Sequence, residues 1–127
     1  MRLFLVRHAE AAPGEPDDLR RLTSSGRDIA RALGERLSGE HPDAVVTSPL
    51  LRTRETGELI ARASHLDAQA DERLAPGATA DALREAVKSR GDTVVAVGHQ
   101  PDCSEIVLEV TGREISFAPG DVAELEL

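Results

Sequence analysis

Arginine and histidine residues stand together at three places that are far apart in the sequence. Arg7-His8, Arg52 and His99 each come directly or a few residues after a short run of apolar residues. Two guanidinium groups can hold the oxygens of a phosphate in a fork, one imidazole can attack phosphorus, and the other can donate a hydrogen bond to the charge of the transition state. If the fold brings these four side chains together, they form a site for phosphoryl transfer.

Each of these residues also has a purely structural interpretation. A histidine next to a strand, such as His8, is often a hydrogen-bonded structural residue, and His99 follows a glycine in a segment that resembles a turn. Arg52 lies among other charged residues, as on the solvated face of a helix. The conjunction favours the functional interpretation, because a single site accounts for all three strand ends at once.

Short apolar runs predict the strands that must position these residues. The runs at residues 3–6, 45–46 and 93–97 are typical of strands that are buried on both faces of a parallel sheet. A weaker pattern at Val122, Leu125 and Leu127 predicts a last strand at an edge of the sheet.

Helical patterns lie between these runs. The first helix is predicted to follow a cap at Thr23 and to end at Gly39, with Ile29, Leu33 and Leu37 on its buried face.

The second helix is predicted to start at Ser48-Pro49, where the serine can cap and the proline is tolerated at the first helical position. This start places Arg52 in the first turn or two, near the positive end of the helix dipole, which attracts anions. The remaining helices are predicted over residues 79–90 and from a capping box at Asp102 and Glu105 to Gly112.

Strands that alternate with helices predict an α/β fold. We expect a three-layer sandwich, with a mostly parallel sheet, helices on both of its faces and an edge strand at the C-terminus. No repeat or linker interrupts the chain, so we expect a single domain over residues 1–127. Ligands of such sheets bind beyond the carboxyl ends of the strands, which is where Arg7, His8, Arg52 and His99 are expected.

The composition narrows the class of partner. A formal net charge of −8 opposes binding to a nucleic-acid backbone, and two Phe with no Trp or Tyr leave few aromatic surfaces for stacking bases. The N-terminal apolar run is too short for a signal peptide or a membrane span, so we expect a cytoplasmic protein. The lone Cys103 fits a reducing compartment and is interpreted as a packing residue, and His41 and His65 are interpreted as surface residues.

Four motifs together resemble the histidine phosphatase superfamily, also called the phosphoglycerate-mutase-like family. They are RHAEA at residues 7–11, LTSSG at 22–26, SPLLRTRET at 48–56 and VGHQP at 97–101. In length and motifs the chain looks most like the small phosphohistidine phosphatases of that family. The resemblance implies that His8 is the nucleophile, that Arg7, Arg52 and His99 bind and polarise the phosphoryl group, and that no metal or other cofactor takes part.

One departure from the family pattern bears on the substrate. Many relatives carry a carboxylate just after an Arg-Leu pair in the middle of the chain, and that residue protonates the leaving oxygen. Here Arg73-Leu74 is followed by Ala-Pro-Gly, and the nearby Asp71 and Glu72 are either substitutes or solvated loop charges. An alkoxide needs that proton, whereas imidazole, with an ordinary pKa of about 6.5, leaves easily once it is protonated or hydrogen-bonded. The pattern therefore favours a phosphoramidate such as phosphohistidine.

The lengths of the connections between the predicted strands and helices favour hydrolysis of a phosphoryl group that is carried by another protein. Residues 10–21 and 65–79 are too short to build a large lid, so an open pocket that admits a side chain of a phosphorylated protein is expected.

We expect an acidic limb of activity set by His8 and an alkaline limb set by His99, which would serve best when protonated.

Three other functions stay open on the sequence alone. The same residues are compatible with a broad phosphomonoesterase acting on small phosphoesters, or with a module that binds phosphorylated partners without turnover. The third function is metal-dependent hydrolysis, because a metal accepts the ligand types of His8, His99, Glu10 and Asp102. These residues lack an HxxxH or HxH spacing, however, and two arginines would repel the ion.

Overall fold

One five-stranded sheet forms the centre of the computed structural model, which describes residues 1–127. Its strands are β1 (Arg2–Arg7), β2 (Ala44–Thr47), β3 (Ala68–Ala70), β4 (Thr93–Gly98) and β5 (Val122–Glu126). They lie in the order β3-β2-β4-β1-β5. Strand β5 lies at one edge of the sheet and pairs antiparallel with β1, whereas all other pairs are parallel. The predicted α/β fold is confirmed, including its C-terminal edge strand.

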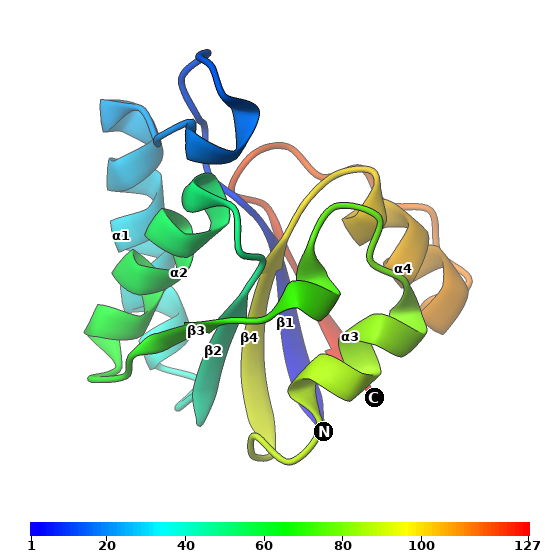
Figure 1. Cartoon of the computed structure of the whole chain (residues 1–127). Helices are drawn as coiled ribbons and strands as arrows, with labels where there is room; N and C mark the ends of the chain where they lie inside the picture. Colours follow the sequence, from blue (N-terminus) through cyan, green and yellow to red (C-terminus); the bar gives the residue numbers. More distant parts are fainter.

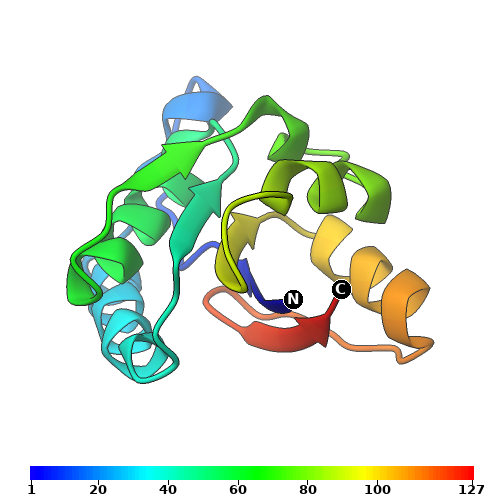
Figure 2. The ribbon, with the colours of Figure 1, turned by 90° about the horizontal axis from the view of Figure 1, so that it is seen from below.

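Two layers of helices cover the sheet (Figures 1 and 2). Helices α1 (Ser24–Ser38) and α2 (Leu51–Ala63) lie on one face, and α3 (Ala80–Val87) and α4 (Asp102–Thr111) lie on the other. Two short 3-10 helices complete the chain, η1 (Asp17–Leu19) and η2 (Glu72–Leu74). None of these helices combines the length and the apolar character of a membrane-spanning segment.

Strand β1 shows how the sequence pattern builds the layers. Leu3 and Leu5 pack in the core cluster that contains residues of α3 and α4, whereas Phe4 and Val6 pack in the cluster that contains residues of α1 and α2. Successive side chains of a strand point to opposite faces, so an unbroken apolar run is what a strand covered on both faces requires.

The helices differ from the sequence predictions at four places, one of which is the end of α3 at Val87 rather than at residue 90. Ile29 is 46% exposed, because the buried face of α1 is formed instead by small and apolar residues on the adjacent side of the helix, Ala30 and Leu33 among them. Helix α2 begins at Leu51 rather than at Pro49, and no side chain caps it. Helix α4 has Pro101 at its N-cap position, so the predicted capping box at Asp102 is wrong.

Three short elements were missed in the sequence, namely strand β3 and the 3-10 helices η1 and η2. The segment predicted as a connection at residues 65–79 contains β3 and η2. Strand β3 has only three residues and carries little apolar side chain, so its pattern is too short to be distinguished from a loop.

The carboxyl ends of β1, β2 and β4 lie at one edge of the sheet, at the top of Figure 1. Hydrogen bonds continue the ladders past the strands. The His8 amide donates to the Gly98 carbonyl at 3.1 Å, and the Ser48 amide donates to the Val97 carbonyl at 3.1 Å. The three segments expected to carry chemistry therefore start side by side.

Candidate active site

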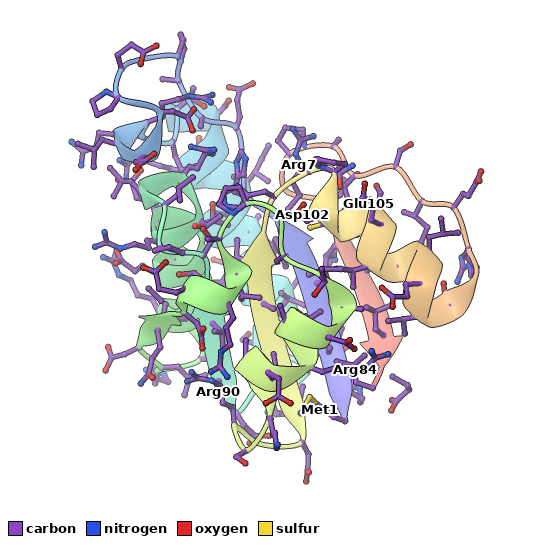
Figure 3. The ribbon with its side chains drawn as sticks, turned by 45° about the vertical axis from the view of Figure 1, so that its right-hand side comes forward. Met1, Arg7, Arg84, Arg90, Asp102 and Glu105 are labelled. Carbon is purple, nitrogen blue, oxygen red and sulfur yellow. The ribbon has the colours of Figure 1, made fainter.

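The structure brings Arg7, His8, Arg52 and His99 together at this edge. The rings of His8 and His99 lie edge to face, with 5.6 Å between their centroids and 60° between their planes. The positive charges of Arg7 and Arg52 both act on each of the two histidines. Figure 3 labels Arg7 at the end of β1, on the side where β4 also ends.

His8 is held as a neutral imidazole with one nitrogen left to react. Its Nδ1 lies 2.8 Å from the carbonyl oxygen of Ala9. A carbonyl can only accept, so Nδ1 carries the ring proton and Nε2 keeps a lone pair. Burial lowers the pKa of His8 below its ordinary value, although the hydrogen bond to Ala9 raises it. The positive charges of Arg52, Arg7 and Arg20 lower the pKa further. A backbone carbonyl therefore orients this ring.

His99 is oriented by a serine instead. Its Nε2 lies 2.8 Å from Oγ of Ser48, which also accepts a hydrogen bond from the Leu50 amide at 3.2 Å. When the Ser48 hydroxyl donates to Nε2, the proton of a neutral His99 lies on Nδ1. His99 can then donate to an anion without carrying a charge.

Both arginines keep a donor that the protein does not use. Arg7 donates from Nη1 to the carbonyl of Phe117 at 2.8 Å, and Arg52 donates from Nη1 to the carbonyl of Asp17 at 3.0 Å. The Nε atoms of Arg7 and Arg52 are buried and have no hydrogen-bond partner within the protein. Leaving a buried donor unpaired is costly, so two such donors around one imidazole indicate a site for an anion with several acceptor oxygens.

The segment SPLLRTRET at residues 48–56 builds one wall of the site. Thr53 Oγ1 donates to the Ser48 carbonyl at 2.9 Å, and Thr56 Oγ1 accepts from the Ala9 amide at 3.1 Å while donating to the Arg52 carbonyl at 2.8 Å. These bonds tie the start of α2 to the residue after His8. Their effect is to fix Arg52 relative to His8 through main-chain atoms and two short threonine side chains, which lose little rotamer entropy when they are ordered.

The segment LTSSG at residues 22–26 supports the opposite side. Thr23 caps α1 by accepting from the Gly26 amide at 3.0 Å, and its own amide donates to the Glu10 carbonyl at 3.0 Å. A Cβ atom at Gly26 would lie 2.2 Å from that carbonyl oxygen, so the close approach requires glycine. The Glu10 carboxylate accepts from Thr23 and Ser25, which places it outside the group around His8.

Two residues of the site were missed in the sequence, Asp17 and Arg20. Asp17 Oδ2 lies 3.2 Å from Nη2 of Arg52, and Asp17 Oδ1 lies 3.2 Å from Nη1 of Arg20. Arg20 also donates from Nε to the Ala12 carbonyl at 2.9 Å. Both residues belong to a polar, exposed loop whose sequence has no periodic pattern, so only the fold reveals that it folds back over Arg52.

The other acidic residues considered in the sequence lie elsewhere. Asp71 is bound by Arg73 and Arg90, and the Arg73 hydrogen bond lowers the pKa of the Asp71 carboxyl to about 2, so it stays ionised and cannot donate a proton. Glu72 is exposed on η2. Asp102 accepts from the amides of Gly77 and Ala78 and so anchors the loop before α3. No three His, Cys, Asp or Glu side chains are grouped so that they could hold a metal ion.

The remaining cysteine and histidines agree with their structural interpretations. Cys103 is buried, and burial raises the pKa of its thiol to about 12, so it is not a thiolate at neutral pH. His41 and His65 are exposed and take no part in the site.

The predicted alkaline limb of activity requires a protonated His99, whereas the surroundings of His99 favour its neutral form. Burial lowers the pKa of His99 to about 4, and the charges of Arg52 and His8 act in the same direction. His99 is therefore already neutral at pH 6, well before the alkaline range. A bound anion favours the protonated form of a neighbouring histidine, so binding is linked to proton uptake in this site.

A titration followed by NMR of the histidine Cε1 protons tests this directly. We expect the midpoints of His8 and His99 to lie below the ordinary value of about 6.5, and both to rise when inorganic phosphate is added. His8→Asn and His99→Asn assign the two signals. A His99 midpoint at or above that ordinary value without phosphate would contradict the account of the electrostatics.

Comparisons with known proteins agree with this geometry. Residues 3–76 match the family model for the histidine phosphatase superfamily (branch 1). An uncharacterised protein of Picosynechococcus sp. is 36% identical over 139 residues, which cover 98% of this chain and 84% of that protein. Phosphoserine phosphatase 1 of Hydrogenobacter thermophilus is 35% identical over 83 residues, which cover 58% of this chain and 37% of that protein.

The fold is also that of a solved phosphatase. The protein histidine phosphatase SixA complexed with tungstate superposes with a TM-score of 0.87 and 26% identity, over 100% of this chain and 88% of that chain. The family match, the relative of similar length and the shared fold agree with one another. The chain belongs to the histidine phosphatase superfamily, branch 1.

Proposed function

We propose that this protein is a phosphohistidine phosphatase that takes the phosphoryl group transiently onto His8. Membership of the superfamily and the likeness to SixA support phosphatase activity. The observation that carries the finer proposal is the neutral His8, with Nε2 unprotonated, beside the two unpaired Nε donors of Arg7 and Arg52.

The first step transfers the phosphoryl group to the protein. The lone pair of His8 Nε2 forms a bond to phosphorus, and the bond from phosphorus to the leaving atom breaks with its electron pair going to that atom. Arg7 and Arg52 donate to the equatorial oxygens, and His99 donates from Nδ1, because charge spreads over these oxygens in the transition state. The Ala9 carbonyl stabilises the positive charge that develops on the His8 ring through the Nδ1 proton.

The second step returns His8 to its starting state. A water molecule attacks the phosphorus of phospho-His8, the bond to Nε2 breaks, and the electron pair returns to the ring. The proton of the water leaves with inorganic phosphate, so atoms and charge balance. The same three donors serve both steps, since both transition states place charge on the same oxygens.

The leaving group decides between a phosphoramidate and an ester. Asp71 is ionised and engaged by two arginines, and residues 75–77 supply no carboxylate, so this segment offers no acid to an alkoxide. Imidazole needs no such acid when its second ring nitrogen is already protonated. A small-molecule phosphomonoesterase is the second candidate, favoured by the likeness to phosphoserine phosphatase 1 over 58% of the chain.

Two peptides of identical sequence test the proposal, one carrying phosphohistidine and the other phosphoserine at the same position. We expect kcat/KM to be at least about 100-fold higher for the phosphohistidine peptide, because loss of general-acid assistance costs roughly that factor or more. Both reactions are followed by release of inorganic phosphate, with spontaneous hydrolysis subtracted. Equal or faster turnover of the phosphoserine peptide would instead identify a phosphomonoesterase.

A further inference from the structure

Asp17 places a carboxylate directly against the guanidinium group of Arg52. Its Oδ2 lies 3.2 Å from Nη2 of Arg52, its Oδ1 lies 3.2 Å from Nη1 of Arg20, and its backbone carbonyl accepts from Nη1 of Arg52 at 3.0 Å. The carboxylate is thus held in one orientation by two arginines. It belongs to η1, at the top of the molecule in Figure 1, above the start of α2.

The carboxylate is more exposed to solvent than the arginine that it binds. The side chain of Asp17 is 59% exposed, whereas that of Arg52, which it contacts, is 9% exposed. A phosphoryl group bound at the buried Nε of Arg52 would therefore lie further from solvent than this carboxylate. A leaving group that points from there toward solvent would pass close to Asp17.

Positioning of Arg52 does not by itself require a carboxylate here. The Asp17 carbonyl already fixes Nη1, and the Arg52 main chain is fixed by α2 and Thr56. A negative charge at this place also weakens the binding of every phosphate dianion, because like charges repel at short range. For a substrate, that cost is offset when the leaving group carries a positive charge close to Asp17.

We propose that Asp17 selects the leaving group, by accepting a hydrogen bond from the protonated ring nitrogen of a phosphohistidine substrate. This inference rests on the proposed function. A phosphohistidine ring protonated on the nitrogen that does not carry phosphorus is a cation, which a fixed carboxylate favours. The hydrogen bonds from Arg20 and Arg52 lower the pKa of the Asp17 carboxyl, so it is ionised at neutral pH and acts only as an acceptor.

The chemistry of this step balances without a proton transfer to the leaving atom. His8 Nε2 bonds to phosphorus, the phosphorus–nitrogen bond of the substrate breaks, and its electron pair goes to the substrate nitrogen. The ring, which was a cation, leaves as neutral imidazole with its proton still facing Asp17. A phosphoserine substrate gains nothing from this carboxylate, because its leaving oxygen needs a donor.

Asp17→Asn tests the proposal with the same pair of phosphohistidine and phosphoserine peptides. We expect kcat/KM for the phosphohistidine peptide to fall about tenfold, as for loss of one partly exposed charged hydrogen bond, and kcat/KM for the phosphoserine peptide to stay the same or rise, because the repulsion between the Asp17 carboxylate and the phosphate is removed. The ratio of the two values does not depend on the active fraction of the preparation. Asp18→Asn is the matched control, because this substitution removes the same charge at the next residue. Asp18 is exposed and forms no side-chain hydrogen bond.

Two results would overturn the inference. An equal fall for both peptides in Asp17→Asn would show that Asp17 acts only through Arg52, and the same change of ratio in Asp18→Asn would assign the effect to surface charge in general. Failure of the proposed function would be a different result. It would appear in the wild-type protein as a kcat/KM for the phosphoserine peptide that equals or exceeds that for the phosphohistidine peptide.

Discussion

Replacement of His8 by asparagine is expected to lower kcat at least about 10⁴-fold, the order of loss seen when an enzyme loses its nucleophile. Asparagine has no ring nitrogen with a basic lone pair, so the first phosphoryl transfer has no acceptor. Release of phosphate from a phosphohistidine peptide measures the loss. Folding is checked by thermal unfolding, because the expected effect is on the chemical step.

The exposed His65 offers a matched control for this change. His65→Asn makes the same substitution at a residue with a positive φ, which asparagine tolerates, outside the site. We expect it to keep wild-type turnover. Retention of more than about a hundredth of wild-type kcat by His8→Asn would remove His8 from the role of nucleophile, because loss of even one hydrogen-bond donor to the transition state costs about 10²–10³-fold.

Arg52→Lys is expected to lower kcat/KM about 100-fold, even though the charge is kept. Lysine has one terminal nitrogen, so it cannot reach the Asp17 carbonyl, the Asp17 carboxylate and a phosphate oxygen together, as the guanidinium of Arg52 can. The same variant should bind inorganic phosphate more weakly, which titration calorimetry measures.

Arg54 serves as the control for Arg52. It lies two residues further along α2, is exposed and forms no side-chain hydrogen bond or ion pair. Arg54→Lys should leave both kcat/KM and phosphate binding unchanged. If Arg52→Lys were equally harmless, the charge alone would be sufficient and the geometry described for this arginine would have no role in the reaction.

The sequence predicts the convergence of the site because it depends on a rule of topology. Parallel strands end at one edge of a sheet, so residues that follow β1, β2 and β4 must come together whatever the details of the loops. The strands themselves are predicted from unbroken apolar runs such as residues 93–97, which only a sheet covered on both faces requires.

The start of α2 shows where local rules fail. Ser48 was predicted to cap a helix, yet its Oγ binds His99, its carbonyl accepts from Thr53, and the helix begins at Leu51. Asp102 was predicted to cap α4, yet it binds the amides of the loop at residues 77–78. In both cases a residue that is well suited to a local role is used for a long-range contact instead, which no local pattern reveals.

Asp17 could not be predicted for a related reason. Its contacts with Arg52 span 35 residues and arise because the loop at residues 12–21 is closed by the bridge between Ala11 and Leu22. The loop has no apolar periodicity, and Asp17 stands beside a second aspartate with no such contact. Long-range ion pairs of polar loops depend on the whole fold, so the charges that surround Arg52 are known only from the structure.

The same limit applies to the charge state of His99. Its sequence neighbours suggest an ordinary, protonatable histidine, whereas burial together with Arg52 lowers its pKa to about 4. Burial of a residue depends on the packing of distant segments, here β1, α2 and the loop before α4. The type of the residue was sufficient to place it in the site, but its protonation required the structure.

The central claim is that the phosphoryl group passes through His8, and a quench experiment tests it most directly. Wild-type protein in excess is mixed with a ³²P-labelled phosphohistidine peptide, the reaction is stopped in alkali within a single turnover, and the protein is digested and mapped. The account predicts labelled phosphohistidine in the N-terminal peptide at His8, formed before phosphate is released and absent from His8→Asn. Label on any other residue, or release of phosphate within a turnover with no labelled protein at any time, would contradict it.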